Sequence, residues 1–495
     1  MAYPTDKPWD LDVRNWGAKG DGTMDDTASI QAALDEAESY GGGIVFFPPG
    51  TYLISATLKL PSKVYIKGVA GTTYNKIGTD PSGFLARVNT VIKLNSNAMS
   101  SISMVEPKIP NDFSSAGIEN IILDGNKDNQ NGSDHYGIKI VDASSGQRSQ
   151  TVIKNVIIYR VKGIGFYGGV NQHELFLDWV TAFSCFSHGF VLRGEDIKGT
   201  RIASGVNSGV GIKFPGSSSA TIPSGSGRFF DIDSWENLIG MEISDTLGYT
   251  FFYLQLSRNS RGGLHIYSTT PQPPGFSPGN IRIYGGVFFQ NSQNQDNGYS
   301  DIKLEPNTFG YSPYDIELLG CQFHGSATTP KPKYVIESTS IEDTSLVAHI
   351  RRCIIIAGFI KRSNYATGVS DTPQAIKDCF NYDTGELLNE HELNYSYINS
   401  NITSTYNLSL GDAYLLVNAF TNNAIVNLPT LSSMTTGRVF YIVKQDGVAG
   451  HTVTIQAAIG ETINGNASVI LSGSPAYQAY MIIHGGTGWV GVKIA

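Results

Sequence analysis

The chain contains 495 residues, of which 55 are glycine, 41% are hydrophobic and only 16% are charged. This length exceeds the ~250–300 residues that a single core usually supports, so we expect several domains or one elongated domain, and the hydrophobic content excludes a wholly disordered chain. The net charge of −8, without a basic block, disfavours a nucleic-acid partner, which would be bound through its phosphates.

Four cysteines are too few for a disulfide framework, and none lies in a CxxC pair. We expect buried thiols at Cys185, Cys321, Cys353 and Cys379. The opening residues, MAYPTDKPWD, lack the basic start and apolar stretch of an export signal, and no run approaches the ~18 apolar residues of a membrane span. We therefore expect neither an export signal nor membrane insertion.

The first predicted elements are a strand at 12–16, a glycine loop at 17–22, a helix that begins near residue 27, and two strands around the Pro-Pro-Gly turn at 48–50. Asp26 or Thr27 can cap the helix, and the three glycines at 41–43 end it. The apolar residues that fall on one helical face are Ile30, Ala33, Leu34 and Ala37.

A glycine loop between a strand and a helix is also where dinucleotide-binding proteins hold a pyrophosphate. Here the glycines are spaced GxxGxG rather than GxGxxG, and three aspartates would place negative charge at the phosphate position. Asp21, Asp25 and Asp26 instead suit loop and helix-cap positions. We interpret the segment as architecture rather than as a cofactor site.

Taken together, residues 15–68, NWGAKGDGTMDDTASIQAALDEAESYGGGIVFFPPGTYLISATLKLPSKVYIKG, resemble the opening of the pectate-lyase-like family found in bacteriophage tailspikes and related polysaccharide-processing enzymes. The resemblance implies a right-handed parallel β-helix whose N-terminal end is covered by a short helix, an all-β fold class. It implies no single reaction, because the family includes hydrolases, lyases and epimerases.

An irregular repeat extends through residues 153–356, with intervals of 22–34 residues between equivalent positions. One apolar position recurs in every unit and is expected to point into the core. Its members are Val156, Val180, Ile202, Ile232, Leu254, Val287, Cys321 and Cys353. Such a repeat indicates a solenoid of stacked coils with surface insertions of varying length.

The period-two alternation of a strand turns the neighbours of each inward residue towards solvent. The residues that precede the inward position on four successive coils are Trp179, Arg201, Asp231 and Tyr253. At ~4.8 Å between rungs, they would form a column about 15 Å long, which is the length of a few sugar rings. Asp233 and Gln255 follow the inward position and are expected on the same outer surface.

Glycoside cleavage commonly uses two carboxyl groups, one as acid and one as base or nucleophile. Asp231 and Asp233 are the predicted catalytic pair, because they share one face of a strand and their like charges should raise one pKa. Glu236, at the following corner beside the expected position of Arg258, is a third catalytic candidate.

The predicted substrate-binding residues surround these carboxylates. Trp179 and Tyr253 would stack on sugar faces, and Arg201 would hold an acidic substituent. The full predicted binding set is Trp179, Arg201, Tyr253, Gln255 and Arg258.

A structural interpretation stands beside this hypothesis. Asp, Arg and Tyr are ordinary residues on solvated strands, and Arg201 with Asp231 would then form only a salt bridge between rungs. The other carboxylates that could serve instead are Glu174, Asp178, Glu195, Asp196, Glu242 and Asp245.

We expect no cofactor and no structural metal. Asp124, Asn126 and Asp128 alternate as in a calcium loop, but Asn129 stands where the sharp turn requires glycine and His135 where a glutamate is needed. A bound calcium ion is therefore an alternative, and a solvated loop between coils is the preferred interpretation of this segment. No HExxH pair or GxSxG elbow supports zinc or serine-nucleophile chemistry.

The predicted domains are a helical cap and β-helix entry at 1–70, the β-helix at 71–365, a polar linker with a short helix at 366–398, and a β-sandwich at 399–495. In NLPTLSSMTTGRVFYIVKQDG and GTGWVGVKI the last domain resembles small terminal β-domains of phage tail fibres and tailspikes. That resemblance implies trimerisation or carbohydrate contact.

These observations favour a tailspike-type depolymerase, a homotrimer on a virion tail that hydrolyses a bacterial capsular or exopolysaccharide. One alternative is a lyase acting on a uronate-containing glycan, for which Arg201 and Tyr253 provide suitable groups. Others are a non-catalytic glycan-binding spike or adhesin and a secreted bacterial enzyme. An epimerase is disfavoured because a Tyr-Asp-Pro-His motif is not found.

Overall fold

The computed structural model divides into two units, Met1–Gln374 and Ala375–Ala495. Within them it describes residues 10–69, 89–97, 101–109, 114–140, 150–169, 174–216, 225–269, 278–295, 298–305, 313–324, 336–338, 348–351, 354–356, 360–361, 374–377, 379–381, 386–388, 398–399, 405–408, 414–417, 419, 422–433, 439–444, 451–472 and 478–493. Among these residues, no helix has the length and apolar character needed to cross a membrane.

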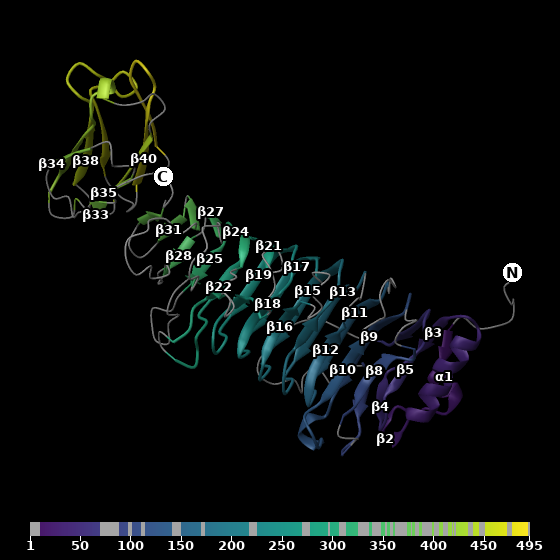
Figure 1. Ribbon diagram of the computed structural model, residues 1–495. Coiled ribbons are helices and arrows are strands. Elements are labelled where there is room, and N and C mark those ends of the chain that lie inside the picture. The colour runs from purple at the N-terminus through teal and green to yellow at the C-terminus, as the bar shows by residue number, and fades with distance from the viewer. Residues whose placement is uncertain are drawn as a thin grey trace, which may run out of the picture. The chain divides into compact units, whose positions relative to one another are not determined.

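The first unit is a parallel β-helix in which strands of two long parallel sheets alternate along the chain. Figure 1 shows the coils stacked one on the next, with the helix α1 (Thr27–Ser39) at the N-terminal end of the stack. The strands of the first sheet are β1 (Asp10–Asp12), β2 (Asp21–Asp25), β3 (Gly43–Phe46), β4 (Gly50–Ile54), β6 (Val64–Lys67), β7 (Thr90–Leu94), β9 (Gly117–Asp124), β11 (Val152–Tyr159), β13 (Phe176–Phe183), β15 (Ile197–Gly205), β17 (Gly227–Trp235), β19 (Tyr249–Ser257), β21 (Gly279–Tyr284), β22 (Val287–Phe289), β24 (Tyr314–Leu319), β25 (Gln322–His324), β27 (Ala348–Arg351) and β28 (Ile354–Ile356).

The second sheet contains one strand from each coil. Its strands are β5 (Leu58–Leu60), β8 (Ser103–Pro107), β10 (His135–Ile140), β12 (Gly163–Gly168), β14 (Phe190–Leu192), β16 (Val210–Pro215), β18 (Ile239–Ser244), β20 (Leu264–Tyr267), β23 (Ile302–Glu305), β26 (Ile336–Ser338) and β29 (Ile360–Lys361). The described residues of this unit also include two short 3-10 helices, η1 (Val13–Trp16) and η3 (Lys127–Asn129). The parallel β-helix with an N-terminal capping helix is therefore confirmed.

A single residue bends each long strand of the first sheet. The bending residues, which we call the corner column, are Asn120, Asn155, Trp179, Arg201, Asp231 and Tyr253, all with φ between 53° and 59°. Gly285 and Gly320 continue the column between β21 and β22 and between β24 and β25, with φ of 71° and 66°. The left-handed conformation suits Gly and Asn and is unfavourable for bulky side chains. One corner residue per coil therefore divides the rungs from β9 to β25 into two arms that face different directions.

A second column of left-handed residues turns the chain from the first sheet to the second. This turn column consists of Arg160, Ser184, Val206, Glu236, Arg258 and Gln290. Inside the turn runs a buried asparagine ladder, formed by Asn207, Asn237, Asn259 and Asn291. The Oδ1 atom of each of the last three accepts from the backbone N–H of the ladder residue one coil before, at 3.0 to 3.2 Å. The ladder satisfies buried backbone groups and holds the coils in register.

The predicted inward position is confirmed from Val156 to Leu254, where every member is at most 1% exposed. It is wrong at Val287, because Gln255 pairs with Val287 and Leu256 with Phe288. Phe288 is fully buried, and Gly286 precedes Val287 at the inward position. The run Val-Phe-Phe is apolar at every residue, so the alternation there carries no information on register.

The N-terminal helix begins at Thr27, and its four predicted inward residues are fully buried. Asp26 occupies the cap position without capping the helix through its side chain, which accepts instead from the backbone N–H groups of Lys19 and Gly20. Asp25 accepts from the N–H of Thr27 at 3.0 Å. The aspartates thus organise the loop. Cys185 and Cys321 are buried free thiols, while Cys353 lies outside the described residues.

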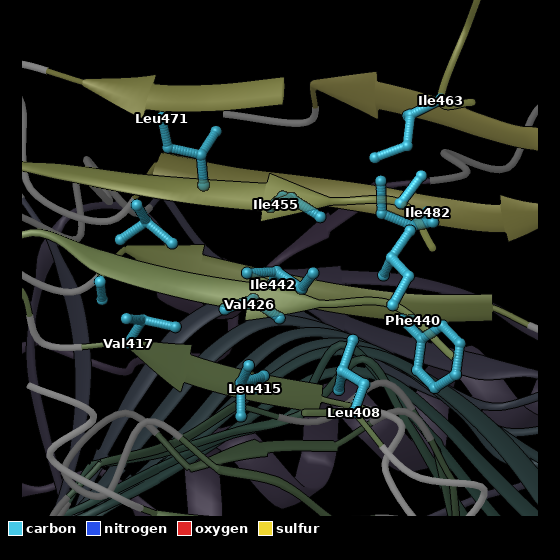
Figure 2. Packing of buried hydrophobic residues seen from close by; sticks show 14 of the residues in the cluster. Leu408, Leu415, Val417, Val426, Phe440, Ile442, Ile455, Ile463, Leu471 and Ile482 are labelled. Carbon is cyan, nitrogen blue, oxygen red and sulfur yellow. The ribbon is translucent and has the colours of Figure 1, made fainter. Parts of the chain in front are cut away.

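In the second unit, two sheets enclose a separate core. One consists of β33 (Ile398–Asn399), β35 (Tyr414–Val417), β37 (Val439–Lys444), β40 (Gln478–His484) and β41 (Trp489–Lys493), and the other of β34 (Thr405–Asn407), β36 (Ala424–Asn427), β38 (Thr452–Gln456) and β39 (Ser468–Ser472), with η4 (Leu431–Ser433) beside them. In Figure 2, side chains including Ile442, Ile482, Val426 and Ile455 fill the space between the sheets. The C-terminal sandwich is therefore confirmed.

Each sheet of this sandwich begins with parallel strands and ends with antiparallel ones. The preceding segment, expected to be a polar linker with a short helix, contains strands where it is described: β30 (Gln374–Lys377), β31 (Cys379–Asn381) and β32 (Glu386–Leu388). The last two form an antiparallel pair. The expected short helix is therefore wrong for these residues, and backbone pairing in the sheet prevails over local preference.

Candidate functional site

The candidate site is the outer surface of the first sheet around β17. Because Asp231 bends this strand, Phe230 before it and Asp231 itself both face solvent. Beyond the bend the alternation resumes, with Ile232 buried and Asp233 on the outer surface. One strand therefore presents, in chain order, a cation at Arg228, an aromatic ring and two carboxylates.

Asp233 is the most perturbed carboxyl group of this surface. Its Oδ1 atom is buried without a hydrogen-bond partner in the described part of the chain. Burial raises the pKa of Asp233 to about 6, and the negative charge of Asp231 adds to the rise. Its Cα partners on the adjacent rungs are Ala203 and Gln255, neither of which brings a positive charge. A carboxyl group in this state keeps its proton up to about pH 6 and can serve as a general acid in mildly acidic solution.

Asp231 has a different environment from Asp233. It is exposed at the corner, whereas Asp233 is half-buried on the next arm. A half-buried carboxyl group with a raised pKa next to an exposed carboxylate is an arrangement that suits an acid and a base. The predicted pairing of these residues on one surface therefore has a physical basis.

The structure places both predicted aromatic residues, Trp179 and Tyr253, on the corner column, where Arg201 and Asp231 lie between them. Tyr253 is 71% exposed and Trp179 is 40% exposed. The guanidinium of Arg201 lies over the Trp179 ring, 4.4 Å from its centre. Arg201 has no carboxylate partner among the described residues, so the alternative of a salt bridge with Asp231 is not supported.

Glu236 and Arg258 lie together at the corner that follows β17, as predicted, and both belong to the turn column. Their side chains form an ion pair at 3.5 Å. Glu236 is thus one bend further along the strand than Asp231, and its charge is already matched by a cation. Gln255 is the neighbour of Asp233 on the next rung and can donate a hydrogen bond to a ligand beside it.

An aromatic strip beside the corner column was missed by the sequence analysis. Phe230 and Phe252 stack on adjacent rungs with ring centres 4.7 Å apart and planes 6° apart, and Tyr284 follows at 5.3 Å from Phe252. Phe230 is 45% exposed. Strict alternation from Ile232 would have turned Phe230 inward, and only the corner conformation at Asp231 reverses it. The signal that could have found the strip is the recurrence of two aromatic residues, FF, on successive coils.

The strip is bordered on the same arm by a row of polar side chains, three of which are basic. Lys198, Arg228, Thr250 and Arg282 are Cα partners on successive rungs. Arg282 is paired with Asp315 at 2.8 Å, whereas Arg228 is exposed and has no ion pair among the described residues. Arg228 and Arg201 therefore leave two positive charges available beside the carboxylates.

Hydrogen bonds and an ion pair among the described residues engage the polar side chains of the loop that was considered as a calcium site. Asp124 accepts from the N–H of Asn126, and the Asn126 side chain donates to the carbonyl of Leu94. Asp128 pairs with Arg160. No group of three or more His, Cys, Asp or Glu side chains suited to a metal ion occurs among the described residues.

A second polar cluster lies on the outer face of the second sheet. Lys213 pairs with Glu242 at 2.9 Å, Tyr267 donates to the same carboxylate at 3.3 Å, and His265 contacts Glu305 at 2.8 Å. Burial lowers the pKa of His265. The polar groups of this cluster satisfy one another, so it is accounted for as part of the scaffold.

Comparison with known proteins identifies residues 11–185 as matching the family described as rhamnogalacturonase A/epimerase, pectate lyase-like. Mannuronan C5-epimerase AlgE4 of Azotobacter vinelandii is 34% identical over 166 residues, which cover 32% of this chain and 27% of that protein. Alginate lyase 7 of the same organism is 31% identical over 166 residues, covering 32% of this chain and 18% of the lyase. The chain thus matches less than a third of either relative.

Among solved structures, the enzymatically active domain of bacteriophage CBA120 tailspike protein 2 is similar with a TM-score of 0.52 at 13% identity, covering 99% of this chain and 70% of that one. This likeness concerns the fold. The pectate-lyase-like resemblance is confirmed. The family match ends at residue 185, so of the predicted site residues only Trp179 lies within it.

Proposed function

We propose that this protein is a polysaccharide depolymerase that hydrolyses glycosidic bonds at the outer surface of β17, using Asp233 and Asp231. The observation that carries the proposal is the state of Asp233, a half-buried carboxyl group with a pKa of about 6 beside an exposed second carboxylate. The pectate-lyase-like family match and the tailspike-like fold support action on a polysaccharide.

In the proposed mechanism, Asp233 donates its proton to the glycosidic oxygen as the bond to the leaving sugar breaks. Asp231 acts from the exposed side, as the base for a water molecule or as the nucleophile. Burial raises the pKa of Asp233 to about 6, so this carboxyl group keeps its proton to a higher pH than an ordinary aspartate. Glu236 is the third candidate and is held by Arg258 at 3.5 Å.

The surrounding side chains suit a glycan with acidic substituents. Tyr253, Phe230 and Trp179 provide exposed aromatic rings for sugars, and Arg201 lies over one face of the Trp179 ring. Arg201 and Arg228 are the positive charges available to carboxylate groups of the glycan. Gln255 completes the polar contacts beside Asp233.

The test is incubation of the protein with purified capsular polysaccharides and exopolysaccharides, with reducing ends and absorbance near 235 nm followed together. Hydrolysis produces reducing ends without absorbance. We expect Asp231→Asn and Asp233→Asn each to lower the rate at least 100-fold. Asp134→Asn is the control, because Asp134 is also exposed and is not among the candidate carboxylates. Full activity in both variants would reject the assignment.

A second candidate function is elimination at a uronate, and the similarity to an alginate lyase favours it. Arg201 would neutralise the carboxylate, and Tyr253 would serve as the base. A rise in absorbance near 235 nm that accompanies the reducing ends, lost in Tyr253→Phe and retained in Asp233→Asn, would establish this reaction instead. Binding without either product would identify a glycan-binding spike.

The proposed setting is the tail of a virion, with a bacterial surface polysaccharide as the partner. The similarity to a tailspike domain supports it. Electron microscopy of the purified particle with antibodies to this chain tests the location.

A further inference from the structure

The outer surface on the two sides of the corner column differs in charge. We call the strand residues before the corner the first arm and those after it the second arm. From β13 to β21 the first arm has three outward cations, Lys198, Arg228 and Arg282. The outward residues of the second arm over the same coils, from β13 to β22, are Thr181, Phe183, Ala203, Gly205, Asp233, Trp235, Gln255, Ser257, Val287 and Phe289. None of these described residues is a cation, and Asp233 is their one charged group.

The second arm contains an aromatic ring held in an unusual position. Trp235 lies two residues after Asp233 and on the same side of the strand. Its Cα partner on the preceding rung is Gly205, where a Cβ atom would overlap the Trp235 ring. The ring therefore lies across the Gly205 backbone, and its centre is 6.3 Å from that of Phe183. The ring is half-buried, and its indole N–H donates to no acceptor in the described part of the chain.

Two uncharged polar groups lie beside this ring on the following rung. Gln255 is the Cα partner of Asp233, and Ser257 is that of Trp235. Neither the amide nor the hydroxyl group forms a side-chain hydrogen bond with the residues described. Amide and hydroxyl groups bind the hydroxyl groups of a neutral sugar, but they do not neutralise a carboxylate as a guanidinium does.

The order of the groups along β17 sets the direction in which a glycan is cleaved. In the proposed hydrolysis, Asp233 protonates the oxygen of the leaving sugar, while Asp231 acts at the anomeric carbon of the other sugar. The leaving sugar thus lies beyond Asp233, over Trp235, and the sugar that is attacked lies over the corner. At ~3.3 Å per residue, Asp231 and Trp235 are roughly 13 Å apart, which is sufficient for two sugar rings.

We propose that the second arm is a subsite for an uncharged leaving sugar, which stacks on Trp235. The inference rests on the proposed hydrolysis. A uronate in this position would face the carboxyl group of Asp233 without a compensating cation, and such a contact is unfavourable. The cation at the end of this arm, Arg258, is already paired with Glu236 at 3.5 Å. The substrate class is therefore a heteropolysaccharide with a neutral sugar on the leaving side of the cleaved bond, and not a polymer of uronates alone.

The cleavage adds one water molecule across the glycosidic bond. The glycosidic oxygen takes the proton of Asp233 and stays on the leaving sugar as a hydroxyl group. The anomeric carbon of the other sugar receives the hydroxyl group of water, and the remaining proton returns to Asp233 directly or through Asp231. The new non-reducing end is therefore the sugar that occupied the second arm, and its identity reports the character of the subsite.

The test uses the full chain with the purified capsular polysaccharides and exopolysaccharides, and with alginate and polygalacturonate as polymers of uronates. Permethylation of the products followed by gas chromatography and mass spectrometry identifies the sugar at the new non-reducing end. We expect a neutral sugar there for every glycan that is hydrolysed, and no cleavage of alginate or polygalacturonate.

The outcomes separate this inference from the proposed function. A saturated uronate at the new non-reducing end, or hydrolysis of either uronate polymer, would overturn the neutral subsite and leave the hydrolase standing. If no glycan yields reducing ends, the proposed function fails and the subsite fails with it.

A substitution at Trp235 tests the ring itself. Trp235→Leu keeps an apolar side chain over Gly205 but removes the stacking surface. We expect KM for the hydrolysed glycan to rise about 10-fold and kcat to change by less than about 2-fold, because the ring binds the leaving sugar in the ground state as well as in the transition state. Trp235→Phe, which retains a ring, should restore most of the loss. Phe186→Leu, at an exposed aromatic residue between β13 and β14, is the matched control and should leave KM unchanged.

An exposed position covers the case in which Trp235→Leu does not fold. Gln255→Ala should raise KM about 5-fold through loss of a hydrogen bond to the leaving sugar. Gln322→Ala is its control, because Gln322 is exposed in the same row two rungs further on. A wild-type KM in Trp235→Leu, or in Gln255→Ala where the first variant does not fold, would overturn the proposed subsite.

Discussion

Replacement of Asp233 by Asn separates the proposed catalytic role of this residue from its effect on stability. The pKa of the carboxyl rises from 3.8 to about 6 on folding, mainly through burial. At ~1.36 kcal/mol per pKa unit, the rise corresponds to about 3 kcal/mol. Because the folded state binds this proton more tightly than the unfolded state, the chain loses this stability as the pH rises from about 4 to about 6.

Asn is uncharged at every pH, so Asp233→Asn avoids this loss. We expect its free energy of unfolding to exceed that of the wild type by up to about 3 kcal/mol at pH 8, and the difference to vanish near pH 4. Urea unfolding followed by tryptophan fluorescence at the two pH values measures the difference. Asp196→Asn, at an exposed position, should show no comparable gain at either pH.

If Asp233→Asn is inactive but more stable than the wild type at pH 8, Asp233 contributes to catalysis and lowers the stability of the fold. If Asp233→Asn were no more stable than the wild type at pH 8, the carboxyl would not be held in a desolvated site. The assignment of Asp233 as the acid would then lose its physical basis.

Three other predictions concern the same unit. The hydrolytic rate of the wild type should fall on the alkaline side with a midpoint near pH 6, as Asp233 loses its proton; a rate that is flat from pH 5 to 8 would exclude it as the acid. Tyr253→Gly should raise the free energy of unfolding by about 1 kcal/mol, because Gly is favoured at a φ of 58°, and should weaken glycan binding measured by calorimetry; tighter or equal binding would contradict its stacking role. Asn237→Ala should lower the free energy of unfolding by about 3 kcal/mol, because buried groups of the asparagine ladder lose their hydrogen-bond partners. The control, Asn427→Ala in the C-terminal sandwich, should change it by less than about 0.5 kcal/mol. Equal effects of the two substitutions would contradict a stabilising role of the ladder.

The sequence was sufficient to predict the solenoid, because apolar residues that recur once per repeat can be buried together in few arrangements other than stacked coils. Val156, Val180, Ile202, Ile232 and Leu254 were placed inward and are buried. The N-terminal helix was predictable for the same reason, since its buried face follows the helical period. The prediction failed at Val287, where three consecutive apolar residues fit either register.

The candidate site was predictable in part. Asp231 and Asp233 share the outer surface as expected, but Phe230 and Phe252 join them only because of the corner residues. A residue in the left-handed conformation within a strand reverses which of the preceding side chains face the core and which face solvent. The sequence gives little indication of this conformation when the residue is Trp, Arg, Asp or Tyr. Glu236 lies at the following corner, as the sequence analysis expected.

The spacing of apolar residues along the sequence thus determines which side chains are buried, because the same local pattern recurs in each coil. The properties of the site depend on distances between coils and were decided only by the fold. The pKa of Asp233 requires desolvation and the charge of Asp231, and the unpaired state of Arg201 requires that it lie on Trp179. Proton affinity and stacking arise from neighbours in space, which a linear pattern does not specify.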